Sequence, residues 1–284
     1  MKKLINKYSI ILILLSLGLS SCVKTFDPKS YAPPLNINGY TASDQIASTN
    51  LVAHWTFNNT LADSLSNTIG VGTGTSFSAG LKDHGLALQG ANNAYVVTNT
   101  PPAIKSLHSF TFTVWYNMPE NTNGAVGILD VANTQNFWGN LDIFFDNGAS
   151  ATTGVLKVHV WNNSGSSTGS DAWEGGYTVN NPWGTWTNIA VTYDDASSTV
   201  KVYYNGSLVG TNVASGFAPL NWTDAQQMSI GTLQFQTTPS LTSATGAQGW
   251  ASYNPGLTDE LRVYNKALSG TEISSLVALQ GRGK

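Results

Sequence analysis

Side chains that suit sugar recognition concentrate near the middle of the chain. The segment from Trp161 to Trp186 is rich in Gly, Ser and Asn, which predicts a loop region. An aromatic ring can stack on the C–H face of a pyranose, while amides and carboxylates bind the sugar hydroxyls. We therefore predict a carbohydrate-binding surface that is formed by Asp171, Trp173, Glu174, Tyr177, Asn181 and Trp183, with Trp138 and Trp222 from other predicted loops.

Two other interpretations of these residues stay open at the level of sequence. The loop tryptophans could instead cover the core beneath long loops, in which case they would bind no ligand. Alternatively, an acid pair assembled from loops, such as Asp171 with Glu174 or Asp224, could catalyse glycoside hydrolysis.

The nearest pair of acids on one predicted strand does not fit a glycosidase. Asp142 and Asp146 are four residues apart in LDIFFD, which separates them by roughly 13 Å at a rise of ~3.3 Å per residue. Retaining and inverting glycosidases hold their carboxyl groups about 5 to 5.5 Å or about 6.5 to 9.5 Å apart. We therefore expect a binding module rather than an enzyme.

Histidine and cysteine spacing argues against zinc. His54, His84, His108 and His159 are scattered, and the chain has one cysteine, so no pair has the spacing of zinc ligands. His54 and His159 fall within strand patterns and are interpreted as half-buried structural residues.

The N-terminus has the organisation of a bacterial lipoprotein leader. Three lysines precede an apolar run that ends at about Leu19, which predicts a signal peptide over residues 1–21. The run is too short for a comfortable span of ~20 residues, and Leu-Ser-Ser-Cys resembles a lipobox with Cys22 as the lipidation site. Since lipid chains anchor a protein to a membrane, we expect a cell-envelope protein, lipid-anchored outside the cytoplasm in the outer membrane. An ordinary signal peptide followed by a spare thiol is the alternative.

The chain is sparsely charged and becomes acidic after the leader. Of 284 residues, 13 are Lys or Arg and 16 are Asp or Glu, so that 10% are charged, against roughly 25% in an ordinary soluble chain. Three of the basic residues precede Cys22, which leaves ten basic against sixteen acidic residues. Because nucleic-acid binding requires clustered Lys and Arg, the charge argues against a nucleic acid as partner.

Short runs of β-branched and aromatic residues fill the chain after residue 48. Residues 22–48 contain three prolines and no sustained periodicity, which predicts a tether. Eleven strands are predicted beyond it, at 51–57, 86–90, 94–98, 109–117, 126–131, 141–146, 155–161, 186–194, 200–205, 227–233 and 259–265. Without helices between them, they favour an all-β antiparallel sandwich or barrel.

Local signals refine this prediction. The strand over 109–117 alternates apolar residues with threonines, so one of its faces should meet the core and the other a second layer or a groove. Asn205-Gly206 predicts a two-residue hairpin turn. A capping box at Ser269 and Glu272 predicts a short C-terminal helix.

Seven short motifs follow one another between about residues 50 and 280. They are LVAHWTF (51–57), GLAL (85–88) before Tyr95-Val96, SFTFTVW (109–115), WTNIAVTYD (186–194), VYYNG (202–206), Ile230-Gly231, and DELRVY (259–264) with ALS (267–269) and Glu272-Ile273. Together they resemble the laminin G-like domain family of the concanavalin A-like lectin and glucanase superfamily. The resemblance implies a jelly-roll sandwich over residues 49–284, with neighbouring first and last strands, and core positions for Trp55, Trp115 and Trp186.

The resemblance also bears on metal binding and activity. Family members often hold calcium near sheet-edge loops, and Asp63 and Asp259 are the matching positions; carboxylate oxygens are ligands that calcium prefers. The alternative is that Asp63 is a turn residue and Asp259 an ordinary strand start. The Glu-x-Asp-x-x-Glu pattern of the superfamily's glucanases does not occur in this sequence.

We therefore expect a cell-envelope lipoprotein whose laminin G-like domain binds a glycan without catalysis, with Ca²⁺ as a candidate cofactor. Because this fold hosts several functions, a protein-binding adhesion or scaffold module is the alternative, and a glycoside hydrolase is a third.

Overall fold

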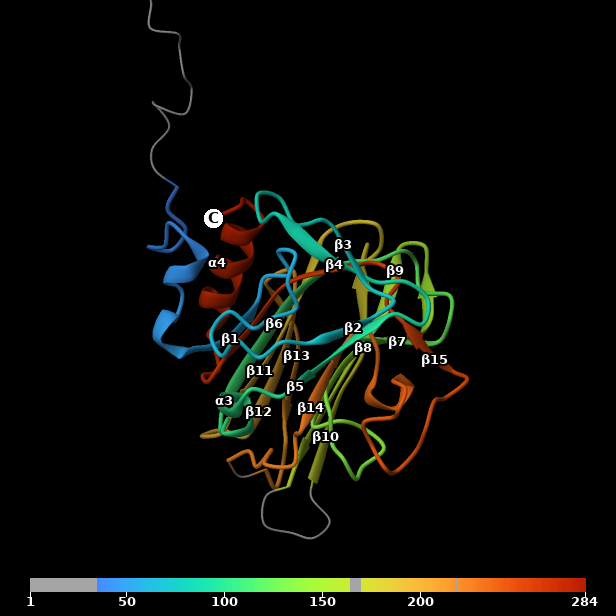
Figure 1. Ribbon diagram of the computed structural model, residues 1–284. Helices are drawn as coiled ribbons and strands as arrows, with labels where there is room; N and C mark the ends of the chain where they lie inside the picture. Colours follow the sequence, from blue (N-terminus) through green and yellow to red (C-terminus); the bar gives the residue numbers. More distant parts are fainter. Residues whose placement is uncertain (1–34, 164–169, 218) are drawn as a thin grey trace, which may run out of the picture. The chain divides into compact units, whose positions relative to one another are not determined.

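Two antiparallel sheets pack face to face in a sandwich (Figure 1). The computed structural model describes residues 35–163, 170–217 and 219–284, so the predicted signal peptide (1–21) and Cys22 lie outside the described residues. Residues 36–284 form one compact unit. The predicted all-β antiparallel sandwich with a short C-terminal helix is confirmed. No helix in the described part of the chain is long and apolar enough to cross a membrane.

Each sheet contains eight strands. Sheet 1 has the order β13 (Ser207–Val213), β12 (Thr199–Tyr204), β11 (Thr187–Asp194), β6 (Phe110–Asn117), β16 (Leu257–Tyr264), β4 (Leu86–Gln89) and β3 (Ser76–Ala79), and β1 (Leu51–Trp55) also pairs with β16. Sheet 2 has the order β10 (Ser170–Asn180), β9 (Thr153–Asn162), β8 (Leu141–Ser150), β7 (Ala125–Val131), β14 (Gln227–Ile230), β5 (Tyr95–Asn99) and β2 (Val71–Thr73), and β15 (Ala251–Tyr253) pairs in parallel with β7. The pairing of β1 with β16 makes the first and last strands neighbours.

The core lies between the sheets and follows the predicted alternation. The apolar residues of β6, from Phe110 to Tyr116, face this core, while Thr111, Thr113 and Trp115 face outward. The outer face is covered by the segment that ends in α4 (Gly270–Gln280): Thr111 Oγ1 donates to Lys266 O at 2.7 Å, and Trp115 Nε1 donates to Gln280 Oε1 at 2.8 Å. The predicted second layer is therefore this segment.

The predicted local signals are confirmed as well. Ser269 Oγ accepts a hydrogen bond from Glu272 N at 3.2 Å, and Glu272 Oε2 accepts one from Ser269 N at 2.7 Å, which is the capping box that starts α4. Asn205 and Gly206, with φ of 49° and 79°, form the tight turn between β12 and β13. Trp55 and Trp115 are buried, whereas Trp186 is only half-buried.

All eleven predicted strands are present, but the prediction of a loop between Trp161 and Trp186 was wrong. Much of that segment is β10, which pairs with β9 along its whole length and has a bulge between Gly175 and Tyr177. Strand β10 is at the edge of sheet 2, and about half of its residues are exposed, most of them polar residues or glycines. Its composition therefore resembles that of a loop.

The segment over residues 36–48, which was predicted to belong to the tether, is part of the compact unit. It carries η1 (Ser43–Gln45), lies beside α4 (Figure 1) and continues through η2 (Ser48–Asn50) into β1. Ile46 is buried, and Asp44 Oδ1 is 2.9 Å from Arg262 Nη1. The prediction of a tether that extends to residue 48 was therefore wrong. The segment is held by contacts with residues distant in the chain, and such contacts produce no periodic pattern in the local sequence.

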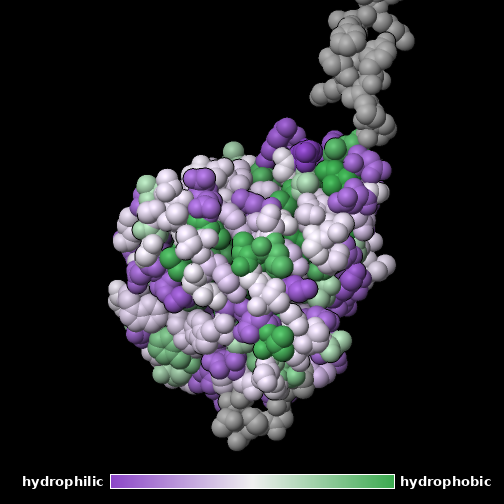
Figure 2. Space-filling view, turned by 180° about the vertical axis from the view of Figure 1, so that it is seen from behind, coloured by the Kyte–Doolittle hydropathy of each residue, from purple (hydrophilic) through white to green (hydrophobic). Residues whose placement is uncertain are grey.

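The face of the sandwich seen in Figure 2 is mixed in hydropathy. Figure 2 shows one face on which small hydrophobic groups are scattered among hydrophilic and neutral ones. This agrees with a chain in which Asn, Ser, Thr and Gly provide most of the contact with water.

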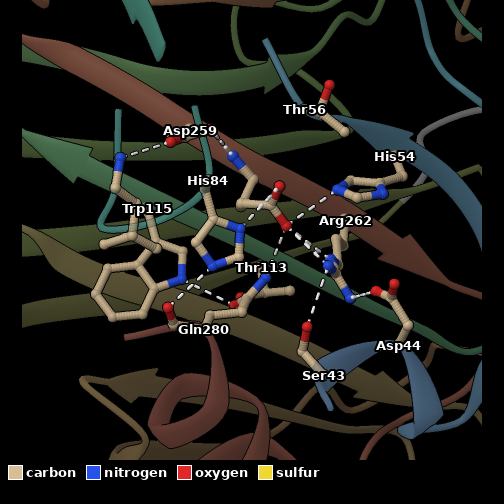
Figure 3. Close-up of polar contacts among 12 residues, drawn as sticks. Ser43, Asp44, His54, Thr56, His84, Thr113, Trp115, Asp259, Arg262 and Gln280 are labelled. Atoms are coloured by element: carbon tan, nitrogen blue, oxygen red, sulfur yellow. Dashed lines mark hydrogen bonds and ion pairs between the residues drawn. The ribbon is translucent and has the colours of Figure 1, made fainter. Parts of the chain in front are cut away.

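A buried carboxylate links sheet 1 to the elements that cover its outer face. Glu260 lies at a bulge in β16, with φ of 47°. Its carboxylate contacts His54, His84, Arg262 and Gln280, four side chains that converge in Figure 3. Its Oε2 accepts hydrogen bonds from Arg262 Nη2 at 2.8 Å and Gln280 Nε2 at 3.0 Å, and lies 3.1 Å from His54 Nε2. Although burial opposes ionisation, hydrogen bonds from His54 and His84 and the charge of Arg262 hold the pKa of Glu260 well below its usual range.

We expect E260Q to lower the free energy of unfolding at pH 7 by about 3 to 5 kcal/mol, because breaking a buried ion pair leaves Arg262 with only the exposed carboxylate of Asp44. The depressed pKa of Glu260 means that its contribution is present above the unfolded value of about 4.3 and is lost as the pH falls below it. Urea unfolding at pH 7 and pH 3.5 should show a smaller difference from wild type at pH 3.5. The exposed E120Q is the control, and an E260Q that is as stable as E120Q at pH 7 would contradict the assignment.

Candidate functional site

Aromatic side chains form a continuous patch on the outer face of sheet 2. The aromatic patch consists of Phe137 and Trp138 from the β7–β8 loop, Phe144 of β8, Trp173 of β10, Phe235 of η3 (Gln234–Gln236), and Trp250 just before β15. These rings come from five separate segments, so only the folded sheet brings them together.

Trp138 is the centre of the patch. Its ring stacks on Phe144 at a centroid distance of 5.3 Å, meets Trp173 edge to face at 5.0 Å and lies 5.6 Å from Phe235. Phe144 and Phe235 are buried, whereas Trp173 and Trp250 are 42% and 41% exposed. The patch therefore has a fixed base and two exposed indole rings.

A hollow of about 200 Å³ adjoins the patch and contains polar groups. It is lined by Asn136, Phe137, Trp138, His159, Trp161 and Asp171. The side chain of Asp171 is half-exposed, and its Oδ2 lies 3.8 Å from His159 Nε2. Aromatic faces beside a few polar groups are the usual composition of a small-molecule site.

A row of cross-strand neighbours lies beneath the patch. Asp130 on β7 is opposite Asp142 on β8, which is opposite His159 on β9, which is opposite Trp173 on β10. Directly opposed residues share one face of a sheet. His159 Nδ1 is 2.9 Å from Asp142 Oδ2, and the His159 ring lies 4.5 Å from that of Trp173, so the acids position the ring that supports Trp173.

Asp130 and Asp142 are both fully buried. Burial, and then the charge of Asp142, raise the pKa of Asp130 well above its usual range. The raised pKa favours the protonated, neutral form of Asp130. Protonation avoids the repulsion of two buried negative charges.

Hydrogen bonds from this row fix the loop that carries Phe137 and Trp138. Asp142 Oδ1 accepts from Gly139 N at 3.2 Å, and Asp130 Oδ2 accepts from Gln234 N at 2.8 Å. Gln234 Nε2 in turn donates to the carbonyl oxygens of Asn136 and Phe137, each at 2.9 Å. Gly139 is required, because a Cβ there would lie 2.6 Å from Asp130 Oδ1. The aromatic patch is thus held rigidly rather than displayed on a free loop.

Three of the predicted ligand-binding residues meet at the aromatic patch: Trp138, Asp171 and Trp173. Two others lie at the far end of the β8–β9 hairpin. Trp183 Nε1 donates to Ser150 O at 2.7 Å, and Asn181 N donates to Thr152 O at 2.8 Å. Trp183 packs on Phe145, which faces the core side of β8, so it does not contribute to the patch.

The remaining predicted residues point into the molecule. Trp222 is fully buried against Phe110, at a centroid distance of 5.2 Å, so its assignment to a ligand-binding surface was wrong. Glu174 is buried on the opposite face of β10 from Trp173, and burial raises its pKa. Tyr177 donates to Glu174 Oε2 at 3.1 Å, and burial together with that carboxylate raises the pKa of Tyr177 to about 12.

Sequence reasoning left Phe137, Phe144, Phe235 and Trp250 out of the site. Phe144 is two residues after Asp142 on a predicted strand, so the sequence indicated that both lie on the same face. Nothing local indicates that Phe235 and Trp250 pack beside β8, because their approach depends on the pairing of β15 with β7.

The predicted calcium ligands, Asp63 and Asp259, both accept hydrogen bonds from backbone amides. Asp63 accepts hydrogen bonds from His54 N at 2.7 Å and Ser66 N at 2.9 Å. Asp259 accepts from Leu81 N and Glu260 N, each at 2.8 Å, and burial raises its pKa to about 7. Both carboxylates are therefore committed to backbone donors. Within the described ranges, no cluster of three or more His, Cys, Asp or Glu side chains could hold a metal.

None of the following acid pairs forms an accessible pair of carboxylates. Asp171 and Glu174 are on opposite faces of β10. Asp142 is buried, while Asp146 pairs with Lys157. Asp130 and Asp142, which are directly opposed on β7 and β8, are both fully buried, so substrate cannot reach them.

Comparisons with known proteins identify the family and the fold. A family model described as Laminin_G_3, Concanavalin A-like lectin/glucanases superfamily, matches residues 90–274. The solved domain 4 of AbnA, a GH43 extracellular arabinanase from Geobacillus stearothermophilus in complex with arabinotriose, is 22% identical, with a TM-score of 0.54, over 80% of this chain and 98% of that chain. No curated protein matches the sequence significantly.

Toxin binding domains share the same fold. The binding domain of Paraclostridial Mosquitocidal Protein 1 is 14% identical, with a TM-score of 0.60, over 81% of this chain and 52% of that chain. The binding domain of botulinum neurotoxin DC in complex with SialylT is 14% identical, with a TM-score of 0.55, over 83% of this chain and 52% of that chain. The chain thus spans about half the length of these toxin domains.

We expect D130N to be less sensitive to alkaline pH than the wild-type protein. The raised pKa of Asp130 means that its contribution to stability is present at low pH and is lost as the pH rises through the folded-state pKa. The amide keeps a donor toward Asp142 without a titrating proton. Between pH 5 and pH 9, the free energy of unfolding of D130N should fall by at least about 1 kcal/mol less than that of wild type. Urea titrations test this, with the exposed D83N as control, and parallel pH profiles for wild type and D130N would contradict the raised pKa of Asp130.

Proposed function

Because the chain belongs to the concanavalin A-like lectin/glucanases superfamily, we propose that its sandwich domain is a non-catalytic carbohydrate-binding module. The observation that carries this proposal is the aromatic patch, where Trp173 and Trp250 expose ring surface beside a hollow that contains His159 and Asp171. The glycan stacks on the indole rings. Asp171 accepts hydrogen bonds from its hydroxyl groups, and the amide of Asn136 accepts or donates further ones.

The rigidity of the patch favours this function. Trp173 packs against both Trp138 and His159, and the loop that carries Trp138 is fixed by Gln234. Binding to rings that are already in position loses little conformational entropy. A preformed stacking surface therefore suits weakly polar sugar faces better than a mobile loop would.

The comparisons support a saccharide as the class of ligand. The arabinanase domain was solved with arabinotriose, and nearly its whole length corresponds to this chain. The acid geometry described above supports binding without hydrolysis, since the buried Asp130 and Asp142 support the patch and do not face a substrate.

The sequence adds a proposal about location. A signal peptide over residues 1–21 and a lipidated Cys22 would hold the module at the outer membrane, outside the cytoplasm. We expect C22A to lose incorporation of labelled fatty acid and to leave the membrane fraction, whereas the neighbouring S21A should retain both. Membrane association and labelling of C22A equal to those of S21A would contradict a lipid anchor.

The glycan-binding proposal is tested by aromatic truncation. On an array of neutral and acidic polysaccharides probed with the detergent-extracted full chain, we expect saturable binding to one polysaccharide class. W173A should weaken that binding at least tenfold, or ~1.4 kcal/mol, because it removes an exposed stacking ring. W250A should weaken it in the same direction.

The matched control is W183A, which removes a tryptophan on the core side of β8. W183A should bind the glycan with wild-type affinity, and thermal unfolding should show that the variant is folded. Repeating the array with a chelator tests the predicted calcium, and unchanged binding there is expected from the hydrogen-bonded state of Asp63 and Asp259. Wild-type affinity in both W173A and W250A would exclude the aromatic patch as the site.

A further inference from the structure

A groove of about 680 Å³ lies on the other side of the sandwich from the aromatic patch. Its floor is the outer face of sheet 1, formed by Thr192 of β11 and by Thr199 and Lys201 of β12. The inner residues of the same strands, such as Val191 and Val200, belong to the core. The groove is therefore separated from the aromatic patch by both sheets.

Two rigid walls border the groove. One is the segment from Lys266 to Glu272, which begins α4 and is fixed to β6 because Thr111 Oγ1 accepts a hydrogen bond from Leu268 N at 2.8 Å. The other wall carries Asn38 and Tyr40. The groove is thus defined by secondary structure on three sides.

The turn that carries Tyr40 is fixed by hydrogen bonds, although it buries little side-chain surface. Ile37 and Tyr40 exchange backbone hydrogen bonds of 2.8 and 3.0 Å around a turn at Asn38 and Gly39, whose φ values are 53° and 93°. Asn38 Nδ2 donates to Ser275 Oγ at 2.9 Å, which fixes this turn to α4. No residue from 36 to 40 is buried. Core packing therefore does not explain why the turn is held at the rim.

The lining has the chemistry of a site for a neutral polyhydroxylated ligand. Hydroxyl groups predominate, and the charged residues balance, with Lys201 and Lys266 against Asp194 and Glu272. Lys266 is paired with Glu272 at 2.7 Å, and Asp194 accepts a hydrogen bond from Ser197. No described residue forms an ion pair with Lys201, so its ammonium group can donate to a ligand. A balanced lining gives no attraction for a polyanion.

We propose that this groove is a second saccharide site, in which Tyr40 stacks on a sugar ring and Lys201 and Thr192 bind its hydroxyls. At more than three times the volume of the hollow beside Trp138, it accommodates a short oligosaccharide. The two sites face away from each other across the sandwich, so one domain bridges two glycan chains. The bridging rests on the function proposed for the aromatic patch, whereas binding in the groove does not.

Binding stoichiometry tests the groove. The detergent-extracted full chain is titrated calorimetrically with a panel of neutral trisaccharides built from pentoses and hexoses. We expect two bound molecules per wild-type chain, one for W173A, one for the double variant Y40A/K201A, and none when all three changes are combined. The wild-type chain should also precipitate the corresponding polysaccharide, and neither W173A nor Y40A/K201A should do so.

The control is K82A, which removes an exposed lysine outside the groove and should keep two sites. Thermal unfolding of Y40A/K201A should match that of wild type, since neither side chain is buried. If Y40A/K201A still binds two molecules, the groove is not a saccharide site. The same conclusion holds if the wild-type chain binds one molecule and W173A binds none. Either result leaves the aromatic patch as a site. One site that Y40A/K201A removes and W173A retains would overturn the patch alone, and no binding at all would overturn both.

Discussion

The buried carboxylate of Glu260 is the constraint on which the outer layer of sheet 1 depends. An unpaired charge is far too costly in the interior, so His54, His84, Arg262 and Gln280 must converge on it. These partners come from β1, the turn before β4, β16 itself and the end of α4. Satisfying one carboxylate therefore places the first strand and the last helix at once. Through Arg262 and Asp44 it also places the segment that precedes β1.

Sheet 2 meets a similar requirement with a different result. Its buried polar row of Asp130, Asp142 and His159 is satisfied by the β7–β8 loop and by the short η3 rather than by a long helix, through Gly139 N and Gln234 N. Loops leave part of the sheet's outer face open, so Trp173 and Trp250 keep exposed ring surface. On sheet 1, the helix and the N-terminal turn instead form the walls of a groove. The two outer faces thus differ because different elements satisfy their buried polar groups.

Local rules explain why most of the fold was predictable. Strands such as β6 alternate because one face meets the core, and α4 begins at a capping box that is complete within four residues. Strand β10 escaped prediction because an edge strand with a bulge at Gly175 needs few apolar residues. The segment over 36–48 escaped it because Ile46 and Asp44 act through residues far along the chain.

The sequence by itself determined the fold class, the family and the sugar-compatible residue types, because periodicity, turn dipeptides and motif order are all local properties. It could not decide which tryptophans would be exposed. Trp173 and Trp222 were both placed in predicted loops, yet Trp222 is buried against Phe110 while Trp173 lies on the outer face opposite His159. Only the tertiary structure decided this, since the face that a residue occupies depends on strand register and on packing against residues distant in the chain.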